Sequence, residues 1–430
     1  MQKRVFNSYF QLNKFNDIDR AALKHNILMH IADGAIFGFA MNFASVNIIM
    51  PVFVERIGGH SIAIGSIPVL WVIGLNLPQF LFTHLFKNDE KIKPVALRYG
   101  LLNRSMFLII SLFAFFLLSN IPKYLSVYAL LSLIFITALT GSIGIPSWYT
   151  LFSKTTPIKL RGRLQAVRQL FSSSLGILAG YLITVILSIV KFPENFAVLF
   201  LTCYILTMVS FNFLRQVNEP ETPINEEIKV NHIKRISRAK KIFKENNNFR
   251  NFIISDALYL ISLTIFAFFA VYGIKKFGLP TSYVGNFTIV LMGSMVFSNI
   301  IFGYLGDTFG HKSNLIMLSL SSMTASLTAI LSNNILVFGC VFVFMGFSIS
   351  IQGISRLAFV VEVCNESERS FYISLLNTIT APALLFGVVS GALISVFGFK
   401  LVFLINALLA GTAALWLYKK VEEPRKRLAV

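Results

Sequence analysis

Two ionisable residues lie close together in an otherwise apolar stretch near the N-terminus. The stretch NILMHIADGAIFGFAMNFASVNIIM carries His30 and Asp33, which share one face of a helix because they are three residues apart. A carboxylate within a membrane is costly unless it is paired or reaches water, and its protonation responds to its neighbours. Asp33 and His30 are therefore our candidates for proton coupling. The alternative is structural, with the two side chains pairing with Arg98 or Arg104 to hold helices together.

The composition indicates which elements carry these residues. Of the 430 residues, 55% are hydrophobic and 13% are charged, and the mean hydropathy is +0.72, whereas soluble domains are about 25% charged. Apolar runs of about 18 residues or more, long enough to cross a bilayer, recur along the chain. We predict an all-α membrane protein whose twelve transmembrane helices start near Asn26, Ser61, Val95, Tyr124, Leu164, Asn195, Asn251, Thr281, Asn314, Ile335, Phe371 and Phe399.

Basic residues in the loops predict the orientation. Loops rich in Lys and Arg alternate with loops that hold few, and the positive-inside rule places the rich set in the cytoplasm. Both termini belong to that set, so the N- and C-termini are predicted to be cytoplasmic. An outer loop with Lys275 and Lys276 departs from the rule. Because these loops account for the formal charge of +19, nucleic acid is not an expected partner.

A polar segment divides the twelve spans into two sets of six. We predict an N-terminal segment over 1–24, a six-helix bundle over 25–216, a linker over 217–249, a second bundle over 250–419 and a tail over 420–430. The linker spaces Ile228, Ile233, Ile236 and Phe243 roughly as a helix does, among many Lys and Arg residues. It is interpreted either as an interfacial helix on anionic lipids or as a soluble linker.

The two sets of spans resemble one another. PVFVERIGGHSIAIGSI after the first span matches AVYGIKKFGLPTSYVGNF after the seventh in its pattern of apolar, charged and glycine positions. Gly176 and Gly180 in the fifth span correspond to Gly387 and Gly391 in the eleventh, and small residues four apart let helices approach closely in lipid. Two pseudo-symmetric six-helix bundles are typical of secondary transporters.

One polar turn follows the eighth predicted span and reads GYLGDTFGHKSNL. Its spacing is carried by Gly303, Gly306, Asp307, Gly310 and Lys312. These residues resemble the loop signature G-x-x-x-D-[RK]-x-G-[RK]-[RK] of the major facilitator superfamily, in which the loop is a latch closed in the outward-facing state. Thr308 and His311 depart from the signature. The first-half copy is reduced to THLFKNDEKIKP, so a one-sided latch is expected.

A second stretch supports the resemblance. IPSWYTLFSKTTPIKLRGRLQAVRQ is similar to a pattern of prokaryotic members, in which an aromatic residue near the end of span four precedes R-G-R and a further basic residue. The matching positions are Trp148, Arg161, Gly162, Arg163 and Arg168. The resemblance covers nearly the whole chain in architecture but only these short loops in sequence.

The family resemblance implies roles for further polar residues. Around the latch, Arg356, Glu362 and Arg369 are expected to join Asp307 in a cytoplasmic gate, with direct substrate contact as the alternative. Spans that line the central cavity in this family hold our substrate candidates, for which interhelical hydrogen bonding is the alternative; they are Asn42, Asn76, Gln79, Arg104, Trp148, Gln169, Gln352 and Asn377. Some proton-coupled exporters of the family use an acidic residue in span one, and Asp33 is an acidic residue in that span.

Other chemistries have little support. The sequence lacks G-x-x-x-x-G-K, H-E-x-x-H and G-x-S-x-G, so neither an enzyme nor direct ATP drive is expected. Its three cysteines show no paired spacing, and no metal or cofactor is expected. The 43 phenylalanines are interpreted as mainly lipid-facing.

We predict a monomeric major facilitator transporter of the prokaryotic cytoplasmic (inner) membrane. It moves a small organic solute by alternating access, and the scarcity of charge in the cavity-lining spans favours proton-coupled export of an amphipathic or weakly charged compound. No pair of Arg or Lys for a multiply charged substrate is evident. The alternatives are uptake or facilitated diffusion of a neutral metabolite such as a sugar or nucleoside, and a non-transporting membrane sensor or scaffold.

Overall fold

The computed structural model describes residues 9–10, 17–82, 91–220, 232–365 and 368–425. Within these ranges the regular elements are helices. Eleven of them are long and apolar enough to cross a bilayer, and α4 (Ser61–Phe82) contains a further apolar helix over Ser61–Asn76. The set is consistent with the twelve predicted spans, and the protein is a multi-pass membrane protein.

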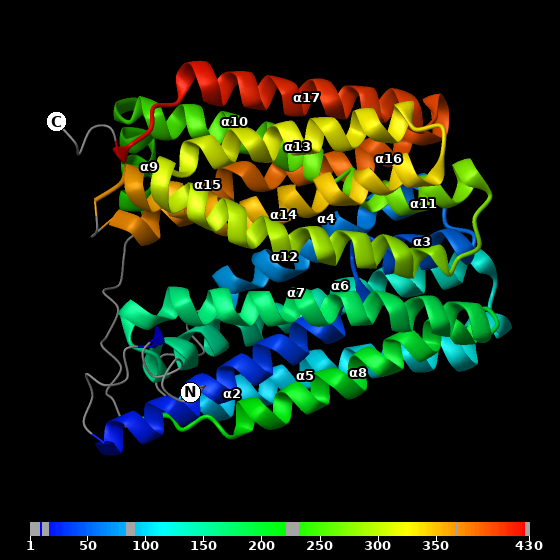
Figure 1. Ribbon diagram of the computed structural model, residues 1–430, viewed down its shortest axis with the longest axis horizontal. Coiled ribbons are helices and arrows are strands. Elements are labelled where there is room, and N and C mark those ends of the chain that lie inside the picture. The colour runs from blue at the N-terminus through cyan, green and yellow to red at the C-terminus, as the bar shows by residue number, and fades with distance from the viewer. Residues whose placement is uncertain (1–8, 11–16, 83–90, 221–231, 366–367, 426–430) are drawn as a thin grey trace. The chain divides into compact units, whose positions relative to one another are not determined.

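The chain forms two compact units (Figure 1). Unit 1 comprises Met1–Ser45 and Leu70–Glu226, and unit 2 comprises Val46–Val69 and Glu227–Val430. The segment Val46–Val69, which lies in the first six spans by sequence, thus groups with the second six. It holds α3 (Ile49–Arg56) and the beginning of α4.

The long helices of unit 1 pack directly against one another. Its remaining elements are α2 (Asp17–Met41), η2 (Asn42–Ala44), α5 (Lys93–Leu112), α6 (Lys123–Thr155), α7 (Ile158–Ile189) and α8 (Glu194–Arg215). Helix α2 packs against α7 and α8, and α5 packs against α6 and α8. Gly38 allows the approach of α2 to α7, because a Cβ there would collide with Ser172.

In unit 2 the long helices likewise pack against one another. After α3 its elements are α9 (His232–Glu245), α10 (Asn247–Leu263), α11 (Phe266–Phe277), α12 (Tyr283–Phe309), α13 (His311–Leu331), α14 (Ile335–Val363), α15 (Arg369–Thr380), η7 (Ala381–Leu385), α16 (Phe386–Phe397) and α17 (Phe399–Lys420). Figure 1 shows α10, α13 and α17 side by side, and α13 also packs against α14. The glycine pair Gly387 and Gly391 in α16 lies against the backbone of α4 at Gly65 and Ser61, as small residues permit.

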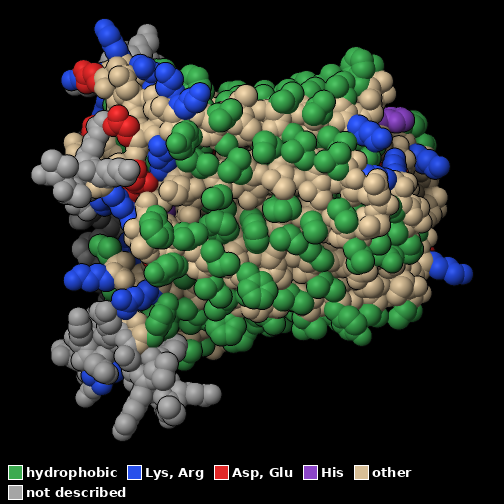
Figure 2. All heavy atoms as spheres, turned by 45° about the horizontal axis from the view of Figure 1, so that its top comes forward, with side chains coloured by type: hydrophobic (Ala, Val, Ile, Leu, Met, Phe, Trp, Pro, Cys, Tyr) green, Lys and Arg blue, Asp and Glu red, His purple; other side chains and the backbone are tan. Residues whose placement is uncertain are grey.

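Several phenylalanines of unit 2 are buried, although the phenylalanines were expected mainly to face lipid. Phe266, Phe268 and Phe269 of α11 are fully buried, and the rings of Phe287 and Phe342 stack 4.3 Å apart. These phenylalanines form a core rather than a lipid-facing surface, because several neighbouring helices supply aromatic side chains at the same level. The long helices expose other large apolar residues instead, and on the face shown in Figure 2 the charged side chains gather at the helix ends.

The spans that carry Asp33 and Asp256 are interrupted. In the first span α2 gives way to the 3-10 turn η2 before α3 begins, and in the seventh span α10 and α11 are separated at Thr264 and Ile265. Backbone amides there bond three residues back, and the Thr264 hydroxyl donates to Ile261 O. Interrupted spans at corresponding positions are a feature of repeat-built transporters.

The two lysines that departed from the positive-inside rule have local partners in unit 2. Lys275 pairs with Glu55 at 3.1 Å. Lys276 Nζ donates to the carbonyls of Ala329 and Ile330 at the end of α13, where a cation is favourable because the last carbonyls of a helix lack partners. Local electrostatics therefore explains their position.

Part of the linker forms helix α9, which packs on unit 2. Ile242 is buried against Phe249 and Tyr372, and Arg238 pairs with Glu368 at 2.8 Å. Ile228 and the side chains of Ile233 and Ile236 lie outside the described residues, and lipid contact stays a prediction.

Candidate functional site

Asp33 lies at the centre of a buried ion cluster in unit 1. Its carboxylate is 3.6 Å from Arg104 Nη2 and 3.4 Å from Arg168 Nη2, and it accepts a hydrogen bond of 2.7 Å from Ser210 Oγ. We call Asp33, Arg104 and Arg168 the arginine cluster. Of the two partners expected for Asp33, the structure supplies Arg104, while Arg98 is exposed. Arg168, from α7, was not anticipated as a partner.

Arg104 is held by several backbone and side-chain acceptors. Its Nε donates to Thr207 O at 2.9 Å, Nη1 to Gly100 O at 3.0 Å and Nη2 to Ser210 Oγ at 3.3 Å. The guanidinium also lies near the ring of Phe37. Arg104, which the sequence analysis placed among the substrate candidates, therefore ties α5 to α2 and α8.

Arg168 has a different environment. Its guanidinium stacks over Trp148 with 4.5 Å to the ring centroid, and Nη1 donates to Gln165 Oε1 at 3.2 Å. Gly34 makes room for this position, because a Cβ there would collide with Arg168 Nε. Arg168 Nε is buried and has no hydrogen-bond partner among the described residues.

His30 makes its hydrogen bond to Thr155 rather than to Arg98 or Arg104, the partners expected for it. Its Nε2 is 2.8 Å from Thr155 Oγ1, whose own proton is used toward Leu151 O at 2.8 Å. Nε2 therefore carries the hydrogen and Nδ1 is an acceptor. This Nδ1 is buried without a partner in the described part of the chain, and the ring meets Phe152 edge to face.

Unit 2 contains a simpler ion pair at the corresponding level. Arg356 Nε and Nη2 each donate to Asp256 at 2.8 Å, and Nη1 donates to Asn377 Oδ1 at 3.0 Å. The hydroxyl of Thr380 accepts from Nη2 at 3.3 Å. A cavity of about 10 Å³ adjoins the pair and is lined in part by Tyr259.

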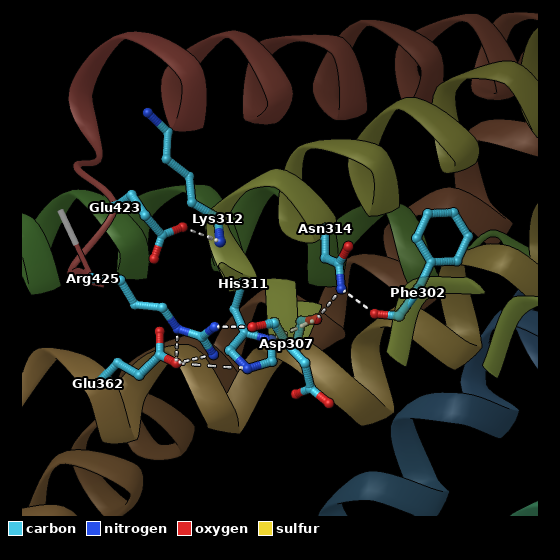
Figure 3. Close-up of polar contacts among 9 residues, drawn as sticks. Phe302, Asp307, His311, Lys312, Asn314, Glu362, Glu423 and Arg425 are labelled. Carbon is cyan, nitrogen blue, oxygen red and sulfur yellow. Dashed lines mark hydrogen bonds and ion pairs between the residues drawn. The ribbon is translucent and has the colours of Figure 1, made fainter. Parts of the chain in front are cut away.

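The residues expected to form one gate separate into different clusters. Arg356 pairs with Asp256, whereas Glu362 accepts two hydrogen bonds from Arg425 in the C-terminal tail, at 2.9 and 2.7 Å. Arg425 also donates to the backbone carbonyl of Asp307 at 2.6 Å (Figure 3). The exposed side chain of Asp307 points away from this cluster. Arg369 begins α15.

The carboxylate at the start of α13 comes from the tail instead. Glu423 Oε2 accepts from Lys312 N at 3.0 Å and lies against Gly310, whose φ is +88° (Figure 3). A charge at this position compensates the unpaired amides of the helix start. Gly306 lets His311 and the side chain of Asn314 approach α12, where Asn314 Nδ2 donates to Phe302 O at 2.7 Å.

Unit 1 repeats this arrangement. Glu219 accepts from Ile92 N at 2.9 Å and Lys93 N at 2.8 Å at the start of α5, and it pairs with Lys154. The residue before Glu219 is Asn218, and its backbone makes two hydrogen bonds with the side chain of Asn26. In unit 2, Asn248 makes the same two bonds with the backbone of Glu422.

We name this arrangement the V-x-E-P clamp. Its signal is visible in the sequence as VNEP at 217–220 and VEEP at 421–424, one after each sixth helix. The sequence analysis missed it because the two copies are short and lie in loops. In each unit the clamp joins the first span, the start of the third and the end of the sixth.

The sequence model of the Major Facilitator Superfamily matches residues 32–298 and 274–429. The chain belongs to the major facilitator superfamily. No curated protein sequence matches the chain.

Solved structures of transporters share the fold of this superfamily member. A D-xylose–proton symporter is 15% identical, with a TM-score of 0.69 over 93% of this chain and 98% of that one. A mutant form of the nucleoside transporter NupG is 13% identical, with a TM-score of 0.68 over 93% and 100%. A bacterial homologue of the human lysosomal transporter Spinster, inward-facing and unoccupied, is 12% identical, with a TM-score of 0.65 over 96% and 98%. Family and neighbours indicate a transporter rather than an enzyme or a sensor.

The superfamily loop residues have distinct local roles. Arg161 donates to Ser153 O and Thr156 O at the end of α6, and Arg163 donates to Tyr9 O at 2.7 Å. A Cβ at Gly162 or Gly303 would meet no atom within 4 Å. Lys312 Nζ donates to Tyr418 O at 3.2 Å. Most of the first-half loop lies outside the described residues.

The remaining cavity candidates fall into two groups. Asn42 is buried and donates to Gly38 O at 2.9 Å and to Phe39 O. The other described candidates reach the surface of their unit; they are the exposed Asn76, Gln169 and Asn377 and the half-buried Trp148 and Gln352. The side chain of Gln79 lies outside the described ones.

Proposed function

We propose that this protein moves a small, amphipathic or weakly charged organic solute across the cytoplasmic membrane by alternating access, and that it couples this movement to a proton. Family membership supports transport itself. The amphipathic solute is supported by the stacking of Arg168 on Trp148, which sets a cation beside an apolar platform. The basic termini support a cytoplasmic position for both ends.

The single observation that supports proton coupling concerns Nδ1 of His30. It is a buried acceptor without a partner in the described part of the chain, and a neutral imidazole can take up one proton at that atom. Asp33, by contrast, is engaged by two guanidiniums and a hydroxyl donor. We therefore assign the proton to His30 and a positioning role to Asp33.

Proton coupling allows two directions of transport. In export by antiport, the direction expected from the sequence, solute and proton exclude one another. In uptake by symport they bind together. The effect of pH on solute affinity has opposite signs in the two cases, so one binding series distinguishes them.

Proteoliposomes with an internal pH indicator test the proposal. Drugs, sugars, nucleosides, amino acids and lysolipids are added in turn, and we expect at least one class to drive protein-dependent proton flux. In His30→Gln the side-chain amide still donates to Thr155, but it cannot take up a proton. We expect this variant to bind the solute and to lose the proton flux. Undiminished proton flux in His30→Gln contradicts the assignment.

A second candidate is uptake or facilitated diffusion of a neutral metabolite. The exposed amides of Asn76, Gln169 and Asn377 favour it, because amides recognise hydroxyl-rich solutes. The similar structures include transporters named for xylose and for nucleosides. Solute flux without any proton movement, in the wild type, would support this candidate over the first.

A further inference from the structure

The arginine cluster carries an unbalanced charge. Arg104 and Arg168 supply two positive charges and Asp33 one negative charge, which leaves a formal +1 in the interior of unit 1. All three residues are at least nine-tenths buried. A net charge at such a position is costly unless a counter-charge arrives.

No other described carboxylate of unit 1 balances this charge. Glu194 is in the first turn of α8, and Glu219 is engaged at the start of α5 and by Lys154. Every hydrogen bond that Arg168 makes in the described part of the chain goes to Asp33 or Gln165.

The second unit contains a one-to-one ion pair for comparison. Asp256 and Arg356 have one charge each and make two hydrogen bonds of 2.8 Å. In unit 1 the distances from the guanidiniums to Asp33 are 3.4 and 3.6 Å. Arg168 therefore adds a second cation to a carboxylate that Arg104 already pairs with.

Arg168 is the least satisfied of the three arginines that pair with Asp33 or Asp256. It uses Nη1 toward Gln165 and Nη2 toward Asp33, while Nε has no partner among the described residues. Arg104 and Arg356 each use all three nitrogens. Nε lies against Gly34, so the donors left for a ligand are the second N–H groups of Nη1 and Nη2, and two such donors suit a planar, two-oxygen anion.

The groups around Arg168 define the rest of the ligand. Its guanidinium stacks on the half-buried Trp148, and the exposed Gln165 and Gln169 lie on the same helix, one turn apart. We propose that the solute is an organic monoanion, of which a carboxylate with an apolar body is the simplest class, and that Arg168 binds its charged group. While His30 is neutral, one negative charge neutralises the cluster. This inference rests on the proposed transport function and specifies its substrate class.

Matched pairs of probes test the charge directly. Benzoate and benzamide, nicotinate and nicotinamide, and hexanoate and hexanamide differ mainly in their charge. The melting temperature of the purified protein in detergent is measured with each probe at constant pH and ionic strength. We expect carboxylates to raise the melting temperature, since a ligand that binds the native state stabilises it, and the matched amides to leave it unchanged. Equal stabilisation by the amides would overturn the proposal.

Two variants on one helix locate the site. Arg168→Gln removes the proposed donor, and we expect about 10- to 100-fold weaker carboxylate binding, as for loss of a charge-assisted hydrogen bond. Arg163→Gln removes the same charge from α7 outside the cluster and should bind as the wild type does. Wild-type affinity in Arg168→Gln contradicts the proposal. If that variant fails to fold, Arg168→Lys keeps the charge, and the wild-type comparison of carboxylate with amide still decides.

The two proposals fail separately. If proteoliposomes accumulate the amides but not the carboxylates, transport holds and the monoanion is wrong. If carboxylates bind selectively and are never moved, the anion site holds and the transport function fails.

Discussion

At the scale of single residues, Asp33 in the first half and Asp256 in the second have different numbers of arginine partners. Asp256 forms a one-to-one pair with Arg356, whereas Asp33 is shared between Arg104 and Arg168. Breaking a buried pair leaves an uncompensated charge, which costs more than removing one cation of two. The number of arginines beside each aspartate thus predicts how much stability is lost when one arginine is replaced.

Arg356→Gln and Arg168→Gln form a matched pair of tests. We expect Arg356→Gln to lower the free energy of unfolding by about 3–5 kcal/mol, because Asp256 is left alone in a buried site. Arg168→Gln should cost less, since the Asp33 pair with Arg104 remains. Thermal unfolding in detergent measures both. An equal loss in the two variants would show that the arginine cluster is as structural as the Asp256 pair.

At the scale of elements, the ends of the helices are held by side chains from distant loops. Glu219 and Glu423 each follow the sixth helix of their half and accept from amides at the start of the third helix. The second-half signature Gly303–Lys312 thereby engages the tail of its own unit. Its Asp307 contributes a backbone carbonyl, and Glu423 takes the position at the helix start.

Gly310→Ala tests the turn of the signature. Its φ of +88° disfavours any side chain, and a Cβ would collide with the Glu423 carboxylate. We expect a loss of about 2–3 kcal/mol in unfolding free energy from strain and loss of the charged cap. Gly303→Ala is the matched control, and it should be neutral or stabilise by up to about 1 kcal/mol because the site is open and helical. Similar effects of the two substitutions would contradict this account.

At the scale of the whole molecule, Val46–Val69 departs from the division by sequence. The segment packs with unit 2 through the Glu55–Lys275 ion pair and the approach of Gly65 to Gly387. In alternating access the first six spans move against the second six. Under the proposed alternating access, we expect this contact to separate in one of the states.

Cross-linking tests that requirement. Glu55→Cys and Lys275→Cys, combined in a background with Cys340 and Cys364 replaced by Ser, are joined by a short bifunctional thiol reagent. We expect the cross-linked protein to lose at least about tenfold in solute flux and a reductant-cleavable reagent to restore it. Each single-cysteine variant, treated in the same way, should transport normally. Full flux through the linked protein would show that the contact does not open during transport.

The sequence by itself determined the class, the spans and the loop signature. Helix starts at Ser61, Ile335 and Phe399 agree with the prediction, because a hydrocarbon core demands uninterrupted apolar runs that one dimension displays. The V-x-E-P repeat was equally visible, but two four-residue copies carry too little pattern to be recognised without the contacts that they make.

Only the tertiary structure decided which charges meet. Arg104 and Arg168 lie 64 residues apart and on different helices, and no spacing rule relates them to Asp33. His30 and Asp33 lie about one helical turn apart, yet Thr155 and the arginines draw them to separate partners. Pairing between helices depends on their rotation and closeness, which Gly34 and Gly38 set through packing against α7. The physical reason is that periodicity within a helix defines its faces, whereas the partners of each face come from the packing of the whole bundle.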